Sequence, residues 1–219
     1  MTYPGGKGKC FQKIINLMPP HDVYIETHLG SGAVLRNKKP ALKNIGIDLD
    51  FDVIQSWIGY SPENHKFFNN DALAFLTKYL FTGKELVYCD PPYVLSTRRR
   101  QKIYKYEYTD EQHGELLDLL CKIPCMVMIS GYENELYDEK LSLWRKEKFF
   151  SKTHNGVREE CVWLNFPPAD KLHDASFLGA NFRERYTIKK RLNRLIQKFE
   201  LMDPIERDYI LEILNKKYI

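Results

Sequence analysis

An aspartate, two prolines and a tyrosine stand directly after a short apolar run. The motif is Asp90-Pro91-Pro92-Tyr93, and the run before it is 86–89. Neither proline can donate a hydrogen bond to a sheet, so the chain must leave a strand here with a stiff backbone. A carboxylate beside fixed carbonyl oxygens can accept both hydrogens of a planar amino group while the tyrosine stacks on its ring. The motif therefore favours a site for such a group over a rigid turn with a packed tyrosine.

A glycine turn and a later aspartate form a second pair of candidates. The turn is 26–32, Glu-Thr-His-Leu-Gly-Ser-Gly, in which Gly30 and Gly32 allow a sharp bend and close approach of a ligand. Asp48 lies 16 residues after Gly32, near the spacing at which an acid reaches the hydroxyls of a ribose. A Gly-x-Gly turn alone is common, and Asp48 alone could be a helix cap. Together they favour a nucleoside-containing cofactor.

These residues follow segments that have the pattern of strands in an α/β protein. The expected strands are 23–26, 44–48, 66–69, 86–89 and 125–130, with helices between them. Polar groups at the carboxyl ends of parallel strands gather at one edge of the sheet, where ligands bind. A capping box at Thr109 and Gln112 predicts that a helix begins there.

The pattern changes near residue 155. Asn155-Gly156 lies between Phe149-Phe150 and the apolar run 161–166, which predicts an antiparallel hairpin at the end of the parallel sheet. Pro167 and Pro168 then mark a boundary, so that 1–168 is expected as one domain and 169–219 as a helical extension. Asp203-Pro204 is a start signal for a final helix.

The excess positive charge lies in this extension. Residues 1–170 carry 22 basic and 22 acidic side chains, whereas 171–219 carry 11 and seven. The asymmetry favours a polyanionic partner about as well as it favours a plain solvated helix face. The basic residues of its first helix are Arg183, Arg185, Lys189, Lys190, Arg191, Arg194 and Lys198.

Composition excludes several classes of protein. The 219 residues are 43% hydrophobic and 28% charged, as in an ordinary globular protein. No apolar run approaches the roughly 20 residues of a membrane span, and the N-terminus lacks the apolar stretch of a secretory signal, so a cytoplasmic protein without membrane association is expected. The five cysteines have no zinc-site spacing. His113, Cys121 and Cys125 could converge on a metal, but small buried residues are the better interpretation, and no metal is expected.

Four motifs in order resemble those of the Dam-type (D12 class) DNA N6-adenine methyltransferases, which use S-adenosylmethionine. The N-terminal Tyr3-Pro4-Gly5-Gly6-Lys7 is similar to the aromatic-x-Gly-Gly-Lys element of that family, the turn 26–32 to its glycine loop, Asp48 to its ribose acid and 90–93 to its catalytic tetrapeptide. The resemblance covers about residues 1–168, and the basic tail is similar to that of phage and prophage members. It implies a Rossmann-like methyltransferase fold with a mostly parallel sheet, a C-terminal antiparallel hairpin and a helical tail.

The resemblance also implies roles for individual residues. The implied catalytic residues are Asp90, Pro91, Pro92 and Tyr93, and the implied cofactor-binding residues are Tyr3, Gly6, Lys7, Glu26, Gly30, Gly32, Asp48, Asp71 and Asp90. The implied reaction begins when adenine flips out of duplex DNA. Its amino group then donates to Asp90 and the Pro91 carbonyl, and Tyr93 stacks on the base.

Two departures from the family pattern are present. Thr27-His28 replaces the usual Pro-Phe, and only 41 residues separate Asp48 from Asp90, too few for a full target-recognition insertion. We therefore expect DNA contacts from a basic, aromatic loop and from the tail. The expected DNA-binding residues are Arg98, Arg99, Arg100, Lys102, Lys105, Arg185, Lys189 and Lys190.

The sequence is compatible with two other functions. The tetrapeptide recognises an amino group and not a sugar, so RNA adenine methylation is one alternative. A catalytically idle DNA-binding protein with this fold is the other, and it predicts no binding of the cofactor. A protein-glutamine methyltransferase is disfavoured, because such enzymes have Asn where this chain has Asp90.

Overall fold

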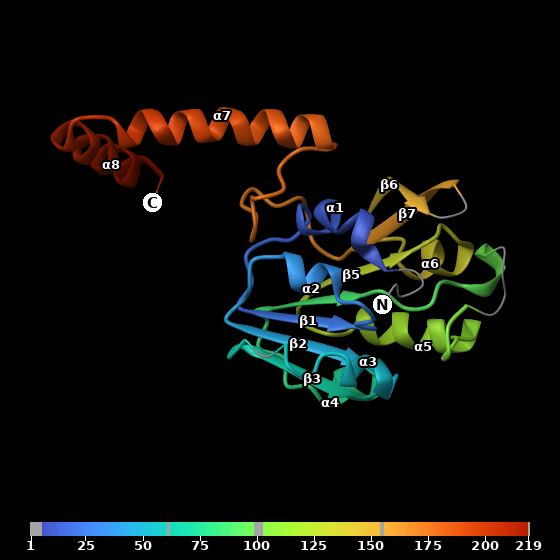
Figure 1. Cartoon of the computed structure of the whole chain (residues 1–219). Helices are drawn as coiled ribbons and strands as arrows, with labels where there is room; N and C mark the ends of the chain where they lie inside the picture. Colours follow the sequence, from blue (N-terminus) through green and yellow to red (C-terminus); the bar gives the residue numbers. More distant parts are fainter. Residues whose placement is uncertain (1–5, 61, 99–102, 154–155, 219) are drawn as a thin grey trace. The chain divides into compact units, whose positions relative to one another are not determined.

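A seven-stranded sheet forms the centre of residues 1–174, as seen in a computed structural model that describes residues 6–60, 62–98, 103–153 and 156–218 (Figure 1). The strand order is β3-β2-β1-β4-β5-β7-β6, in which β7 runs antiparallel to both β5 and β6 and the other neighbouring pairs are parallel. The strands are β1 (Val23–Thr27), β2 (Lys43–Asp48), β3 (His65–Asn69), β4 (Glu85–Cys89), β5 (Met126–Gly131), β6 (Arg145–Thr153) and β7 (Gly156–Leu164). The predicted Rossmann-like sheet with a C-terminal antiparallel hairpin is confirmed, although the two hairpin residues 154–155 lie outside the described residues.

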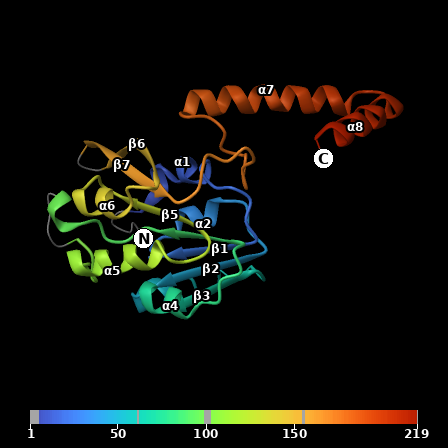
Figure 2. The same cartoon turned by 180° about the vertical axis from the view of Figure 1, so that it is seen from behind.

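Short helices cover both faces of this sheet. They are α1 (Phe11–Ile15), α2 (Ala33–Asn37), α3 (Phe51–Gln55), α4 (Ala72–Lys78), α5 (Asp110–Leu120) and α6 (Glu135–Lys140), with 3-10 turns η1 (Lys7–Lys9) and η2 (Leu95–Thr97). Helix α1 packs against α2, and α5 packs against α4 and α6. Figures 1 and 2 show α5 on the opposite side of the sheet from α1 and α2. The layered arrangement leaves the carboxyl edge of the strands for the loops.

The core lies where the central strands are covered on both faces. All five residues of β4 are buried, and Val87, Val127 and Ile25 from three adjacent strands have no exposed surface. A parallel strand buried on both faces needs a continuous apolar run rather than an alternating one. This explains why 86–89 is the clearest strand in the sequence.

Side-chain caps set where several helices begin. Thr109 Oγ1 accepts from the Gln112 amide at 3.3 Å, and Gln112 Oε1 accepts from the Thr109 amide at 2.9 Å, which confirms the predicted capping box at α5. Asp71 caps α4 and Asn134 caps α6 in the same way. These bonds satisfy amide groups that the helices leave unpaired at their starts.

The chain divides into two compact units, 1–174 and 175–219. Residues 169–174 belong to the first unit, where the His173 amide donates to the Met18 carbonyl and Asp174 accepts from the Lys39 amide. The second unit contains α7 (Phe182–Glu200) and α8 (Pro204–Tyr218), and the predicted helix start at Pro204 is confirmed. None of the helices that the structure describes is long and apolar enough to cross a bilayer.

Candidate active site

A pocket opens at the carboxyl ends of β1, β2 and β4, and the sequence motifs converge on it. Its floor and walls include the turn after β1, the end of β2, the tetrapeptide after β4 and the segment before α5. The lining residues include Gly6, Lys7, Glu26, His28, Gly30, Gly32, Asp48, Asp90, Pro92, Tyr104, Lys105 and Tyr108.

Asp48 joins the glycine turn to the end of β2. Its Oδ2 accepts from the Gly30 amide at 2.8 Å, and its Oδ1 accepts from the Asp50 amide at 2.8 Å. Burial raises the pKa of Asp48, and the two amide bonds act against that rise. Each carboxylate oxygen retains a lone pair, so Asp48 can hold the turn and still accept a hydrogen bond from a ligand hydroxyl.

The second glycine of the turn is required by packing. Gly32 has φ +56°, and a Cβ there would lie 2.2 Å from Cζ2 of the buried Trp57. The Trp57 indole N–H also donates to the Gly30 carbonyl at 3.2 Å. A left-handed conformation and the absence of a side chain are thus both needed at Gly32 for the indole to support the turn.

Thr27-His28 forms a polar link in place of an apolar one. The His28 ring contacts Thr27 Oγ1 through Nδ1 at 3.0 Å and the Tyr108 hydroxyl through Nε2 at 2.9 Å. Burial lowers the pKa of His28 to about 3, so the ring is neutral at physiological pH. His28 also has φ +59°, which is uncommon for a residue with a side chain. The departure from the family pattern therefore connects the glycine turn to the segment before α5.

Four side chains form a buried polar cluster beside the pocket. Lys7 Nζ donates to Asp90 Oδ1 at 2.6 Å and to the Tyr93 hydroxyl at 2.7 Å, and the Tyr93 hydroxyl donates to Glu160 Oε2 at 3.0 Å. The fourth contact is Lys7 Nζ to Glu160 Oε2 at 3.6 Å. The side chains of Lys7, Asp90 and Glu160 are 6%, 17% and 8% exposed.

The charges within the cluster influence one another. Burial alone would lower the pKa of Lys7, but the carboxylates of Asp90 and Glu160 outweigh it and raise that pKa above its usual value. Burial raises the pKa of Asp90, the Lys7 ammonium opposes the rise, and Glu160 adds to it. Lys7 is therefore a fixed cation held against the Asp90 carboxylate.

Tyr93 is buried, and both its ring and its hydroxyl have partners within the protein. It is 9% exposed, and its ring meets the ring of Tyr132 edge-on with centroids 4.6 Å apart. Asp90 and Pro92 line the pocket, while Pro91 and Tyr93 are buried behind them. Stacking of Tyr93 on a base stays a prediction, and the structure adds an anchoring role for its hydroxyl.

Glu26 lies at the inner end of the pocket beside a tyrosine. The Tyr24 hydroxyl donates to Glu26 Oε2 at 2.8 Å inside the core. Burial raises the pKa of Glu26 to about 8, the Tyr24 hydrogen bond opposes the rise, and the nearby Asp90 charge adds to it. Glu26 is thus a carboxyl group that a cationic ligand can ionise near neutral pH.

Two predicted cofactor residues stand apart from the pocket lining. Asp71 accepts from the Ala74 amide at 2.8 Å as the cap of α4, and its neighbours Asn70 and Ala72 line the pocket instead. Tyr3 lies outside the described residues. A contact of either residue with a cofactor remains a prediction.

An ion pair within the chain holds the first arginine of the basic loop. Arg98 was expected to contact phosphates, but its side chain is 4% exposed and its guanidinium forms a bidentate pair with Glu107 at 3.1 and 2.6 Å. Glu107 also accepts from the Ile103 and Tyr104 amides, so the pair closes the loop. DNA binding by Arg98 stays a prediction, and it would compete with Glu107. Arg99, Arg100 and Lys102 lie outside the described residues.

Lys105 connects the same loop to the start of α3. Its ammonium donates to Asp50 at 2.8 Å and to Asp52 at 2.9 Å, and its side chain is half exposed. Together with Tyr104 and Tyr108, it brings the loop over the pocket. DNA binding by Lys105 stays a prediction, and it would compete with these two acids.

The predicted basic residues of the second unit lie on α7. Lys189 and Lys190 are exposed, and the half-buried Arg185 donates to the Gly179 carbonyl at 3.4 Å. Lys190 also lines a groove along α7 with Tyr186, Arg191, Arg194 and Lys198. The prediction of nucleic-acid contacts concerns this unit by itself.

The suggested metal ligands have other surroundings. The His113 ring contacts the Tyr137 hydroxyl through Nδ1 at 3.0 Å, while Cys121 is exposed and Cys125 half-buried. Across the described ranges, no group of three metal-ligating side chains comes together.

The sequence motifs miss several residues of the site. Glu160 comes from β7, 70 residues after Asp90, and Tyr104 and Tyr108 line the pocket from the basic loop. The aromatic residues of that loop were visible as a pattern, but were interpreted as a DNA surface. Glu160 could have been suspected because two adjacent acids, Glu159 and Glu160, cannot both face solvent in a half-buried strand.

Comparisons with known proteins identify the fold. No protein-family model and no curated protein matches the chain. A spermidine synthase from Thermotoga maritima matches with a TM-score of 0.52 and 13% identity, over 76% of this chain and 62% of the synthase. A spermidine synthase in complex with the transition-state analogue AdoDATO matches with 0.53 and 12%, over 76% and 64%.

A third solved structure is similar over more of its length. M. capricolum TrmK in complex with S-adenosyl-homocysteine matches with a TM-score of 0.49 and 9% identity, over 94% of this chain and 93% of TrmK. At these identities the likeness is one of fold, and the predicted Rossmann-like class is confirmed by the two synthases.

Proposed function

We propose that this protein is an S-adenosylmethionine-dependent methyltransferase that methylates N6 of adenine in DNA. One observation carries the proposal. Lys7 and Asp90, 83 positions apart, meet at 2.6 Å at the edge of a pocket that also contains Asp48. The motifs that resemble the adenine methyltransferases are thus neighbours in space, which chance matches scattered along a sequence would not be.

The pocket residues fit such a cofactor. Leu29, Ile47 and Leu49 provide apolar walls suited to an adenine ring, and the Asp48 carboxylate has free lone pairs for ribose hydroxyls. The carboxyl groups of Glu26 and Asp90 suit the positive end of the molecule. When bound, S-adenosylmethionine supplies a methyl group that is attached to a positively charged sulfur. The sulfur keeps the electron pair of the C–S bond when the methyl group is transferred.

Asp90 would orient the accepting amino group. Its carboxylate, held by Lys7, can accept one N6 hydrogen, and the Pro91 carbonyl can accept the other. These bonds turn the nitrogen lone pair out of conjugation with the ring and toward the methyl group. As the new C–N bond forms, N6 loses a proton, and Asp90 is the carboxylate available to accept it. Orientation and fixed charges then contribute most of the acceleration.

Sequence recognition would need few residues of this chain. The 41 residues between Asp48 and Asp90 contain α3, β3, α4 and β4, which leaves no separate recognition domain among the residues described there. Exposed lysines of α7 are suited to phosphate contacts, which strengthen binding without reading bases. Such contacts favour a nucleic acid over a small-molecule substrate.

Transfer of labelled methyl from S-adenosylmethionine to polymers tests the proposal. Unmethylated duplex DNA should become labelled, and RNA of the same sequence should not. Label in RNA alone would show that RNA, and not DNA, is the substrate. No label in either polymer, with DNA bound and no cofactor bound, would support the catalytically idle alternative.

A further inference from the structure

We propose that Glu160 is a positioning residue for the Asp90 site, whose carboxylate fixes the Tyr93 hydroxyl and the Lys7 ammonium and so sets the orientation and charge of Asp90. The role in catalysis rests on the proposed function. The effect on Asp90 itself does not, and it can be measured separately.

The sheet register brings Glu160 to the site. Cys161 of β7 pairs with Gly131, the last residue of β5, so Glu160 lies just beyond the carboxyl end of that strand. Its side chain is 8% exposed and points at the tetrapeptide from the strand next to β5. An antiparallel strand therefore adds a group to the edge where the parallel strands end.

The hydrogen bonds in the cluster have a defined direction. A phenol hydroxyl has one hydrogen, and in Tyr93 this hydrogen goes to Glu160 at 3.0 Å. The hydroxyl oxygen can then accept from Lys7 at 2.7 Å, which in turn donates to Asp90 at 2.6 Å. The Tyr93 hydroxyl also lies within hydrogen-bond reach of Asp90, so without the Glu160 acceptor its hydrogen would turn to the Asp90 carboxylate. Lys7 would also lose its contact with Glu160.

The same carboxylate influences the charge of Asp90. Lys7 alone would lower the pKa of Asp90, whereas burial and the Glu160 charge raise it. Other titratable groups in the surroundings are Glu26 from β1, Tyr88 from β4 and Tyr104 from the basic loop. Tyr88 and Tyr93 remain neutral, because burial raises the pKa of each well above its usual value. The Glu160 carboxylate therefore acts against the effect of the Lys7 ammonium on the pKa of Asp90.

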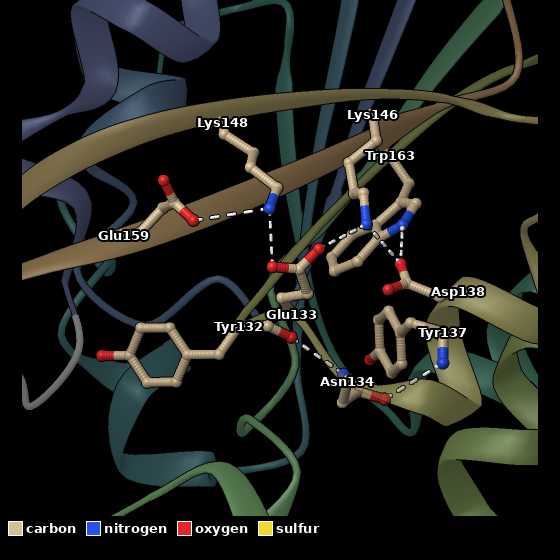
Figure 3. Close-up of polar contacts among 9 residues, drawn as sticks. All are labelled: Tyr132, Glu133, Asn134, Tyr137, Asp138, Lys146, Lys148, Glu159 and Trp163. Atoms are coloured by element: carbon tan, nitrogen blue, oxygen red, sulfur yellow. Dashed lines mark hydrogen bonds and ion pairs between the residues drawn. The ribbon is translucent and has the colours of Figure 1, made fainter.

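The adjacent glutamate provides a matched control. Glu159 is exposed on the other side of β7, where its carboxylate lies 3.5 Å from Lys148 Nζ. Figure 3 shows Glu159 in a surface ladder with Lys148 and Glu133. This ladder continues through Lys146 to Asp138, which also accepts from the Trp163 indole. Glu159→Gln thus removes the same charge from the same strand without touching the buried cluster.

The first test measures the Asp90 carboxyl directly. Carbon-13 NMR of the protein labelled at aspartate carboxyls gives the titration midpoint of Asp90, assigned by its absence in Asp90→Asn. In Glu160→Gln the midpoint should move down by about one pH unit, since a like charge is removed. In Glu159→Gln it should stay at the wild-type value. An unchanged midpoint in Glu160→Gln would overturn the proposal, whatever the protein's activity.

The second test measures catalysis. In Glu160→Gln, kcat should fall about tenfold or more, KM for DNA should change less than twofold, and the acid limb of the pH profile should move to lower pH. Glu160→Asp keeps the charge but shortens the reach to Tyr93. It should retain the wild-type Asp90 midpoint while kcat falls. Equal kcat losses in Glu160→Gln and Glu159→Gln, with no displaced acid limb, would reduce Glu160 to a structural role.

Discussion

Among single residues, burial and neighbouring charges set the protonation of three carboxyl groups in the pocket, those of Asp48, Asp90 and Glu26. Asp48 accepts from two amide groups, Asp90 from the Lys7 ammonium, and Glu26 from the Tyr24 hydroxyl and the Leu35 amide. The three therefore differ in how readily they gain or lose a proton. The Lys7 ammonium favours the charged form of Asp90 more strongly than the neutral donors favour the charged forms of Asp48 and Glu26.

Binding of the cofactor should release a proton from Glu26. With a pKa of about 8, Glu26 is mostly protonated at pH 7 in the free protein. The ammonium and sulfonium of S-adenosylmethionine favour the ionised form, so affinity should rise as pH rises toward 8 and level off above it. Calorimetry in buffers of different ionisation enthalpy should detect nearly one proton released per cofactor at pH 7, and almost none above about pH 9. Glu26→Gln should bind without this release. Equal release by the two proteins would assign the proton to another group.

At the scale of elements, the turn after β1 shows how a motif depends on distant packing. Gly30 and Gly32 both have positive φ, and the turn is supported by Trp57, which follows α3, and by Tyr108, which precedes α5. The turn is therefore a product of several elements. Its stability should respond to changes that never touch a ligand.

Substitution of Gly32 by alanine, compared with the same substitution elsewhere, should separate the cost of the left-handed backbone conformation from the cost of the clash with Trp57. The left-handed conformation should cost about 1 to 2 kcal/mol, and the clash with Trp57 a further 1 to 3 kcal/mol or so. Gly59 has φ +95° with open space around it, so Gly59→Ala should show the conformational cost alone. Denaturant unfolding of both variants measures the two terms. If they lose equal stability, Trp57 moves aside and does not constrain Gly32.

The strands and the tetrapeptide could be predicted from the sequence because their signals are local. The run 86–89 is buried on both faces, and the capping box at Thr109 involves residues three apart. The polar cluster could not be predicted in full, because Glu160 reaches it through strand register, a long-range property. The pairing of Arg98 with Glu107 could not be predicted either, because the two residues are nine positions apart and meet only in the folded chain.

At the scale of the whole molecule, charge is distributed unevenly between the two units. Basic and acidic residues balance over 1–170, and the surplus lies in the helical extension, where Lys189 and Lys190 are exposed on α7. Exposed like charges on one helix repel each other weakly, and bound phosphate groups would relieve that repulsion. Phosphate binding by α7 stays a prediction.

Removal of these charges should change how DNA binding depends on salt. Replacing Arg185, Lys189 and Lys190 with alanine should raise Kd and reduce the slope of log Kd against log salt concentration by about two to three. Three exposed lysines at the amino ends of the strands, on the edge of the sheet opposite the pocket, provide the control: Lys78, Lys84 and Lys122. Their removal changes net charge equally. If both triple variants lose the same slope, the effect comes from total charge and α7 is not the contact.

The central claim is tested most directly by nucleoside analysis of duplex DNA treated with the protein and S-adenosylmethionine. The wild-type protein should produce N6-methyladenine. Asp90→Ala should produce none while it retains the wild-type circular dichroism spectrum, because the acceptor that orients the amino group is gone. Methylation at another position, or N6-methyladenine formed equally well by Asp90→Ala, would contradict the account.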